Sequence, residues 1–476
     1  MPSPAPHLRP SPSSRVATEV TRLAELLFGP APGEAETRRG WGLRYAMVAC
    51  ILALIIVARR PDAVTNPQFW EEDGFVFFYQ NLMLGFWGAL RMLHEGFPYL
   101  IQRLIAAAGG AVPFTLAPRV YTASSIAVTA LAMATFCLPG FRHLVRSDAF
   151  RIAFCIGCVC LPSGHETILA TPTNLGWFLA AWLFLISLVR LPHQPAAVAA
   201  LAACGIAVVC STPLGLLCSP LWLLRASAGA LRGDRREFWF ATSLLITFGA
   251  IVLITHDLGA HPPLVVQVPQ HGTLVVGFTW HNLVNACASA VASLFVRYDA
   301  LAGVVLSRTG LLWAGGALVV AVLVGIAALT EAQRLPVMLL CLIGAAGALS
   351  VTLAGRPVWN ILLGSPGNWE LPRHYAVFPT ALILLALTVT VDGVRRAVPR
   401  AVLTGLVVTA IAWAWWPSIA IAPLADLQWP VWAARLETKL ATGSREPLVI
   451  PIHPFVWPLR FDAPPARRGE AEHSPG

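Results

Sequence analysis

Long apolar segments are the feature of this sequence that most limits its fold. Stretches of roughly 17 to 25 apolar residues recur between residues 45 and 420, and a helix of that length crosses a hydrocarbon core about 30 Å thick. Only 12% of the 476 residues are charged, against about 25% in an ordinary soluble domain. The segments also lack the apolar/polar alternation of a transmembrane barrel. The sequence therefore predicts an all-α, polytopic membrane protein.

Basic residues set the expected orientation of the helices. The net charge of +9 is scattered over short loops, so it indicates topology rather than nucleic-acid binding. Residues 1–43, rich in Pro, Ser and charge, are expected to form a flexible cytoplasmic segment. The basic loops around Arg142 and at 225–237, 331–334 and 392–400 are expected on the same side. No signal-peptide core comes before the first span, which fits a bacterial plasma membrane.

This orientation predicts about eleven transmembrane helices in a bundle over residues 44–420. Their expected ranges are 45–58, 117–139, 149–162, 171–190, 195–211, 212–225, 238–255, 309–330, 336–354, 375–391 and 401–420. An odd number leaves residues 421–476 outside as a short extracytoplasmic tail. For residues 265–308 the sequence leaves two alternatives, which are helices lying on the outer surface and a hairpin of two short spans.

The first loop expected outside, residues 60–100, carries three adjacent acids in "WEEDG". Glu71, Glu72 and Asp73 stand between aromatic residues, which favours a segment at the membrane interface over a solvated loop edge. Adjacent carboxylates there raise the pKa of at least one of them, which suits a proton acceptor. Arg59 and Arg60, expected at the membrane edge, weakly oppose an outer position for this loop.

Three further polar clusters are expected at the same face, because ionisable residues at membrane depth are costly. They occupy residues 161–179, 364–379 and 447–461, and Arg103 lies near them in the apolar stretch after the first loop. Their candidate functional residues are His165, Glu166, Asn174, Arg373, His374 and Tyr375. A helix cap or ordinary membrane-edge residues are the structural alternatives, whereas a functional Arg373 would match lipid phosphate oxygens.

These landmarks, in this order, resemble the GT-C superfamily of polytopic glycosyltransferases. Its members carry an acidic motif in the first extracytoplasmic loop, where this chain has "EEDG". A looser likeness is to uncharacterised bacterial membrane proteins with four short motifs, which here are Glu72 to Gly74, Asn174 to Leu179, Arg373 to Tyr375 and Ile450 to Pro454. This chain departs in its three adjacent acids, in His374 between Arg373 and Tyr375, and in a tail too short for the large soluble domain of many members.

The resemblance implies transfer of a sugar, with inversion, from a polyprenyl-phosphate donor to an extracytoplasmic glycan or lipid acceptor. Asp73, with Glu72 second, would take the proton of the acceptor hydroxyl. Arg373, assisted by His374 or Arg103, would hold the leaving phosphate. The other substrate-binding candidates are Glu71, His165, Glu166, Asn174 and Tyr375. No cofactor is expected; a divalent cation between Glu72 and Asp73 is the alternative, although no further ligand spacing supports it.

Three other functions compete with this interpretation. A transporter or flippase of a lipid-linked sugar, or of another anionic lipid, would use similar residues, but it should also carry charges near mid-span. A glycan polymerase or ligase would depend mainly on arginines in large outer loops. A non-enzymatic assembly subunit would scatter its polar residues without a shared face.

Overall fold

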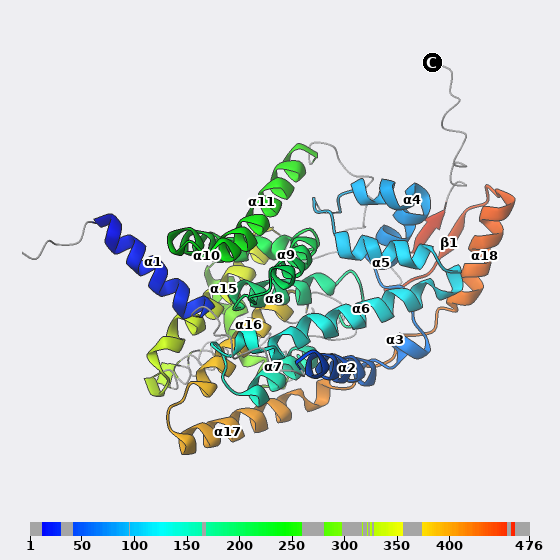
Figure 1. Cartoon of the computed structure of the whole chain (residues 1–476). Helices are drawn as coiled ribbons and strands as arrows, with labels where there is room; N and C mark the ends of the chain where they lie inside the picture. Colours follow the sequence, from blue (N-terminus) through cyan, green and yellow to red (C-terminus); the bar gives the residue numbers. More distant parts are fainter. Residues whose placement is uncertain are drawn as a thin grey trace, which may run out of the picture.

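The computed structural model is mostly helical (Figure 1). It describes residues 12–29, 41–94, 96–163, 168–258, 280–297, 328–355, 374–454 and 458–461, with four further positions between 317 and 325. The main helices are α1 (Pro12–Phe28), α2 (Trp41–Arg59), α3 (Asp62–Thr65), the π-helix η2 (Asp73–Phe78), α4 (Tyr79–Arg91), α5 (Leu100–Gly110), α6 (Ala117–Ala134), α7 (Asp148–Cys160), α8 (Leu175–Leu188), α9 (Pro195–Val209), α10 (Ser219–Arg232), α11 (Arg235–Leu258), α12 (Trp280–Ala292), α15 (Leu335–Gly355), α16 (His374–Asp392), α17 (Ala397–Trp415) and α18 (Trp429–Thr442).

Seven helical segments in the described residues are long and apolar enough to cross a membrane. They are Trp41–Arg59, Phe114–Cys137, Pro213–Arg232, Arg235–Thr255, Ala332–Thr352, Tyr375–Asp392 and Ala397–Ser418. Each overlaps one of the ranges expected from sequence, so the chain has the architecture of a helical membrane protein.

The expected count of eleven is not confirmed. The ranges 149–162, 171–190 and 195–211 hold α7, α8 and α9, which have 13, 14 and 15 residues. At 1.5 Å per residue, such helices reach only about 20 Å. The range 309–330 lies mostly outside the described residues, and within 265–308 the described part contains α12.

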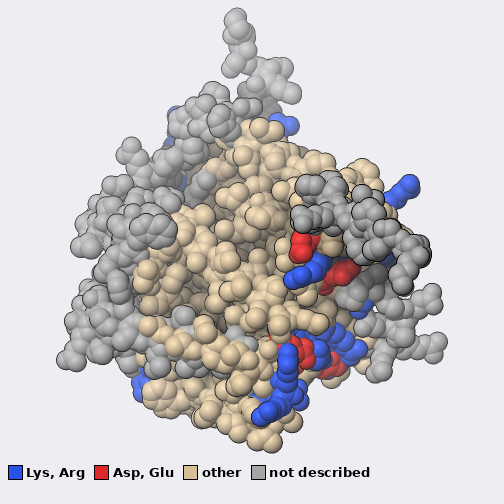
Figure 2. Space-filling model, turned by 90° about the vertical axis from the view of Figure 1, so that its left-hand side faces the viewer, with Lys and Arg blue, Asp and Glu red and all other residues tan. Residues whose placement is uncertain are grey.

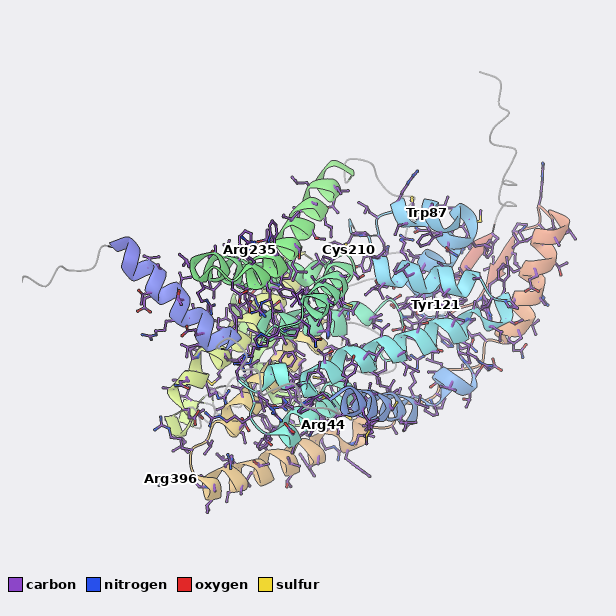
Figure 3. The ribbon with its side chains drawn as sticks, in the orientation of Figure 1. Arg44, Trp87, Tyr121, Cys210, Arg235 and Arg396 are labelled. Atoms are coloured by element: carbon purple, nitrogen blue, oxygen red, sulfur yellow. The ribbon has the colours of Figure 1, made fainter. Side chains whose placement is uncertain are left out.

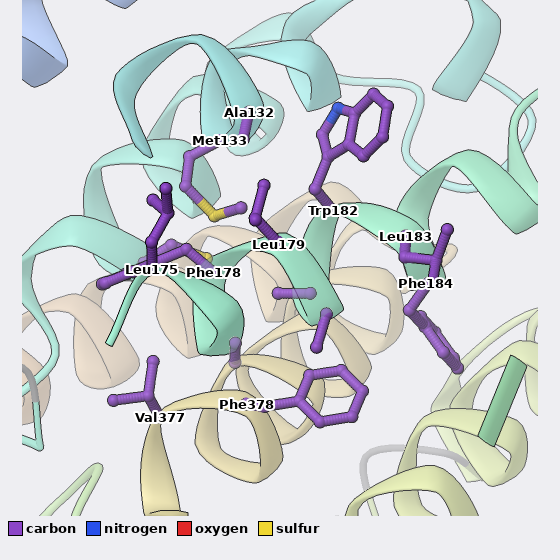
Figure 4. Packing of buried hydrophobic residues seen from close by; sticks show 14 of the residues in the cluster. Ala132, Met133, Leu175, Phe178, Leu179, Trp182, Leu183, Phe184, Val377 and Phe378 are labelled. Atoms are coloured by element: carbon purple, nitrogen blue, oxygen red, sulfur yellow. The ribbon is translucent and has the colours of Figure 1, made fainter. Parts of the chain in front are cut away.

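Helix α8 lies at the centre of the core. Its Leu175, Phe178, Leu179 and Trp182 face Met133 of α6 and neighbours on α16 (Figure 4). The spanning window of α16 is 94% buried, whereas that of α17 is 6% buried. Helix α17 therefore lies at the periphery, where its apolar side chains would meet lipid.

Described segments near both ends of the chain form regular secondary structure. Residues 12–28, expected as part of a flexible segment, form α1, which packs Ala24, Leu27 and Phe28 into the core. The tail contains α18 and an antiparallel hairpin of β1 (Leu448–Ile450) and β2 (Leu459–Phe461), with Leu448 opposite Phe461. Apolar side chains at alternate strand positions, Leu459 and Phe461, turn inward and explain why this pair forms.

The basic loops meet at one end of the bundle, which we name the basic end. Arg146 donates to both carboxylate oxygens of Glu331, at 2.9 and 2.7 Å, and its backbone N–H donates to Asp392 at 2.7 Å. Arg44, Arg235 and Arg396 all lie to the left of Trp87 and Tyr121 in Figure 3. On the left-hand face of the molecule, acidic and basic side chains gather in one band (Figure 2). The opposite end carries the acidic loop and the tail, and we name it the acidic-loop end.

Candidate functional site

The acidic segment is held by the C-terminal tail. The N–H of Glu71 donates to the carbonyl of His453 at 2.5 Å, and the N–H of His453 donates to the carbonyl of Phe69 at 3.2 Å. The rings of Trp70 and His453 stack with centroids 6.2 Å apart. A Cβ on Gly74 would lie 2.7 Å from Cδ1 of Ile452, so a larger residue here would have to displace the end of the Ile452 side chain.

Asp73 begins η2 and points into the protein, with 2% of its surface exposed. Its Oδ1 accepts two hydrogen bonds from Thr173, at 2.7 Å from the backbone N–H and at 2.6 Å from the hydroxyl. Burial raises the pKa of Asp73 to about 8, although the Thr173 hydrogen bonds and the positive charge of Arg60 act to lower it. The carboxyl is therefore largely protonated at neutral pH and can lose its proton just above it.

Glu72 faces a different set of groups. It lies 4.0 Å from Nε2 of His94, and 18% of its side chain is exposed. Burial raises the pKa of the Tyr99 hydroxyl, and the neighbouring Glu72 and Tyr375 raise it further. The Tyr375 ring meets the Trp177 ring edge to face, at 5.1 Å. Glu72 thus belongs to the same site as residues from two of the other polar clusters.

Arg103 is a buried cation near this site, with 2% of its surface exposed. Its guanidinium donates to the Gln80 side chain at 2.7 Å and to the Met92 carbonyl at 2.9 Å, and it lies over the Phe77 ring at 5.5 Å. Its Nε has no hydrogen-bond partner. Among the described residues no carboxylate lies within 4.0 Å of it. A guanidinium so deeply buried calls for an anion.

Further buried polar atoms between α5 and α6 have no hydrogen-bond partner among the described residues. They are the Tyr121 hydroxyl, the Ser125 hydroxyl and Oε1 of Gln102. Tyr121 and Ser125 are one turn apart on α6, and Tyr121 interacts electrostatically with both Asp73 and Arg103. Because an unpaired buried polar group costs about 1–3 kcal/mol, these atoms indicate a region prepared for a polar ligand.

Backbone strain gathers around the same region. Among the described residues, four non-glycine residues have positive φ: Glu71 at 39°, Tyr99 at 54°, Ala170 at 63° and Gln428 at 55°. Two of them belong to the acidic loop, Ala170 comes shortly before Thr173, and Gln428 comes just before α18. Strain of this kind, about 1–3 kcal/mol per residue, is typical of functional sites.

The structure brings together the sequence-predicted residues that it describes. Glu71, Glu72, Asp73, Arg103 and Tyr375 lie in the contacts above. Asn174 is buried at the start of α8, directly after Thr173. The candidates His165, Glu166 and Arg373, and the side chain of His374, lie outside the described residues.

Sequence reasoning missed several residues of the site. Thr173, Tyr99 and Tyr121 carried no signal of their own in the sequence. Arg60, expected at the membrane edge, is 1% exposed and donates to the Leu169 carbonyl at 2.5 Å and to Asp62 at 3.4 Å. One signal in the sequence could have identified Arg60. It directly follows Arg59 at the end of the first span, and two adjacent arginines at membrane depth need partners.

Arg59 ties the acidic-loop end together rather than facing the membrane edge. Its guanidinium donates to carbonyls of Ser418 at 3.0 Å and Ile419 at 3.1 Å, just after α17, and to the Val159 carbonyl in α7. Backbone carbonyls bind both buried guanidiniums, so Arg59 and Arg60 are not basic residues of a solvent-exposed loop. They therefore do not count against the expected outer position of residues 60–100.

Two further features bear on what the site could hold. Among the described residues no three His, Cys, Asp or Glu side chains come together as metal ligands. A cavity of about 280 Å³ opens beside the site between α4 and α5. It is lined mainly by apolar residues, including Phe78, Leu82, Phe86, Ala107 and Phe114.

Comparisons with family models, curated proteins and solved structures give no match. The chemistry of the site is therefore argued from the residues of this chain.

Proposed function

We propose that this chain is a membrane glycosyltransferase of the polyprenyl-phosphate-dependent kind. It would transfer a sugar from a lipid-phosphate donor to an extracytoplasmic glycan or lipid acceptor. The observation that carries the proposal is Asp73, a buried carboxyl whose pKa of about 8 lies near the pH at which a general base works best.

The surroundings of Asp73 supply what this reaction needs. Arg103 is a buried cation with no acid beside it in the described residues, which suits the phosphate of the donor. Unpartnered hydroxyls of Tyr121 and Ser125 could pair with sugar or phosphate oxygens. The neighbouring cavity is lined by Asn81 as well as by apolar side chains such as Phe78 and Leu82, and the apolar side chains could contact an isoprenoid chain.

The reaction would proceed as one displacement. The acceptor hydroxyl oxygen attacks the anomeric carbon, its proton passes to ionised Asp73, and the bond from the anomeric carbon to the phosphate oxygen breaks. The electron pair leaves with the lipid phosphate, whose negative charge Arg103 would stabilise. Attack opposite the leaving group gives inversion. A general base of this kind contributes about 10²- to 10⁴-fold to the rate.

Turnover by the purified full chain in lipid nanodiscs tests the proposal. A panel of radiolabelled polyprenyl-phosphate sugars is supplied with candidate lipid and glycan acceptors, and release of polyprenyl phosphate is measured. Asp73→Asn should abolish transfer while the protein stays folded. Glu72→Gln should keep most of it, and the exposed Glu446→Gln serves as the matched control for loss of one carboxylate.

Other outcomes would identify a different function. Loss of transfer in Glu72→Gln, with Asp73→Asn active, would make Glu72 the base. Absence of turnover with every donor, combined with movement of the intact lipid-linked sugar across the bilayer, would replace transfer by transport.

A further inference from the structure

A tryptophan at the basic end is flanked by two cations. Trp41 is the first residue of α2 and of the first candidate span. The guanidinium carbons of Arg44 and Arg142 lie 5.0 and 4.9 Å from its ring centroid. Tryptophan at a helix end of this kind marks the level of the lipid head groups.

One carboxylate serves three arginines here. Asp148 pairs with Arg44, with Arg142 at 3.5 Å and with Arg151. The side chain of Arg151 is 0% exposed, whereas those of Arg44 and Arg142 are 34% and 30% exposed. The cluster therefore presents a surplus of two positive charges, and the two arginines that reach the surface carry it.

The other acids of the basic end are already engaged. Glu331 accepts both hydrogen bonds of the Arg146 fork, and Asp392 accepts the backbone N–H groups of Arg146 and Ser147. Neither of them forms an ion pair with Arg44 or Arg142 among the described residues. The surplus charge beside Trp41 is therefore not cancelled by these neighbours.

Both guanidiniums reach the surface beside the Trp41 ring. A phosphodiester could accept hydrogen bonds from both of them, while its acyl chains lie along α2, whose exposed Leu43, Met47 and Leu54 give an apolar surface.

We propose that Trp41, Arg44 and Arg142 form a binding site for the phosphate head group of an anionic phospholipid, such as phosphatidylglycerol, in the leaflet at the basic end. This site is separate from the acidic-loop end and does not depend on the function proposed there. It would fix the depth of α2 in the membrane and thereby the position of the loop that follows it.

Native mass spectrometry of the full chain, titrated with phosphatidylglycerol or phosphatidylcholine, tests the site. Wild type should retain phosphatidylglycerol in preference to phosphatidylcholine. Arg142→Gln should weaken retention roughly fivefold, because a basic residue at a membrane surface contributes about 1 kcal/mol. Arg44→Gln removes the second guanidinium that reaches the surface and should weaken retention by a similar factor.

The matched control removes charge from the same end without touching the site. Arg395 and Arg396 are exposed before α17, and the Arg395→Gln/Arg396→Gln variant should retain phosphatidylglycerol as wild type does. Equal weakening in this control, or equal retention of the two lipids by wild type, would overturn the proposal. Displacement of the bound lipid by low millimolar inorganic phosphate would show a site for free phosphate rather than for a lipid. Thermal unfolding of each variant verifies that the fold is intact.

Discussion

Two buried charges near the acidic loop, Asp73 and Arg103, differ in their partners from two buried arginines at the basic end. At the basic end, the buried Arg151 donates to Asp148 and the buried Arg225 donates to Glu237. At the acidic-loop end, Asp73 and Arg103 are each 2% exposed, and among the described residues neither has an oppositely charged side chain within 4.0 Å. Among the described residues, positive-φ residues of the acidic loop, Glu71 and Tyr99, also lie at this end.

The difference separates scaffold from site. A buried ion pair with all its hydrogen bonds satisfied holds a fold in one arrangement, and its removal leaves an uncompensated charge. A buried charge without a partner already carries that cost in the free protein. It is expected where a ligand completes the pairing, as a phosphate would for Arg103.

Arg225→Met at the basic end should cause the largest loss of stability. Arg225 holds Glu237 and donates to the Ser187 carbonyl at 3.1 Å and to the Val189 carbonyl. Breaking a buried pair costs about 3–5 kcal/mol, measured as the free energy of unfolding in detergent. The exposed Arg235→Met is the control and should change it by less than about 0.5 kcal/mol. Equal effects of the two variants would remove the distinction between scaffold and surface.

Contact between the acidic loop and the tail can be tested by adding a methyl group at Gly74 and removing one from Ile452. Gly74→Ala places a methyl group against Cδ1 of Ile452 and should cost about 1–3 kcal/mol through overpacking. Ile452→Val removes that Cδ1 and alone should cost about 0.5–1.5 kcal/mol. The double variant should be more stable than Gly74→Ala, with hydrogen exchange of residues 69–78 restored. Additive losses in the double variant would show that loop and tail do not pack as described.

Titration of Asp73 should change stability in a defined direction. Its pKa is about 8 in the folded protein, against 3.8 for a free carboxyl, so the folded state binds more protons between these two pH values. The resulting stabilisation is fully present below pH 4 and is lost as the pH rises through 8.

Thr173→Val should shift the pH range over which ionisation of Asp73 lowers stability. Of the changes considered, it should alter stability least. The hydroxyl of Thr173 favours ionised Asp73 by a hydrogen bond of 2.6 Å. Its loss should raise the pKa of Asp73 by about one pH unit, since a hydrogen bond to a charged group contributes about 1.5–3 kcal/mol and one unit equals about 1.4 kcal/mol. The pH profiles of transfer and of unfolding should shift together. A shift toward acid would contradict the assigned hydrogen bond.

Much of the framework could be predicted because it depends on local composition. The span at 45–58 and the span at 375–391 appear as uninterrupted apolar windows, and α2 and α16 occupy them. Within the range 171–190, expected to cross the membrane, the structure has α8, which is 14 residues long and is mostly buried by other helices. An apolar run alone does not distinguish lipid from protein as its surroundings.

The site was only partly predictable because it depends on contacts between distant segments. The acids of "EEDG" stand out in a chain with so little charge, and the basic loops led us to expect them at the opposite face of the membrane. The partner of Asp73, Thr173, is 100 residues away, and His453 acts through its backbone. Neither contact leaves a pattern in the sequence, since both arise from packing of the tail and of the turn before α8.

The protonation of Asp73 tests the difference between the two ends most directly. Infrared difference spectra of wild type against Asp73→Asn, recorded in nanodiscs from pH 5 to pH 10, report this one carboxyl group. We expect the band of a protonated carboxyl at neutral pH, replaced by the carboxylate band with a midpoint near pH 8. A carboxylate band throughout this pH range would contradict a buried, uncompensated acid at the acidic-loop end.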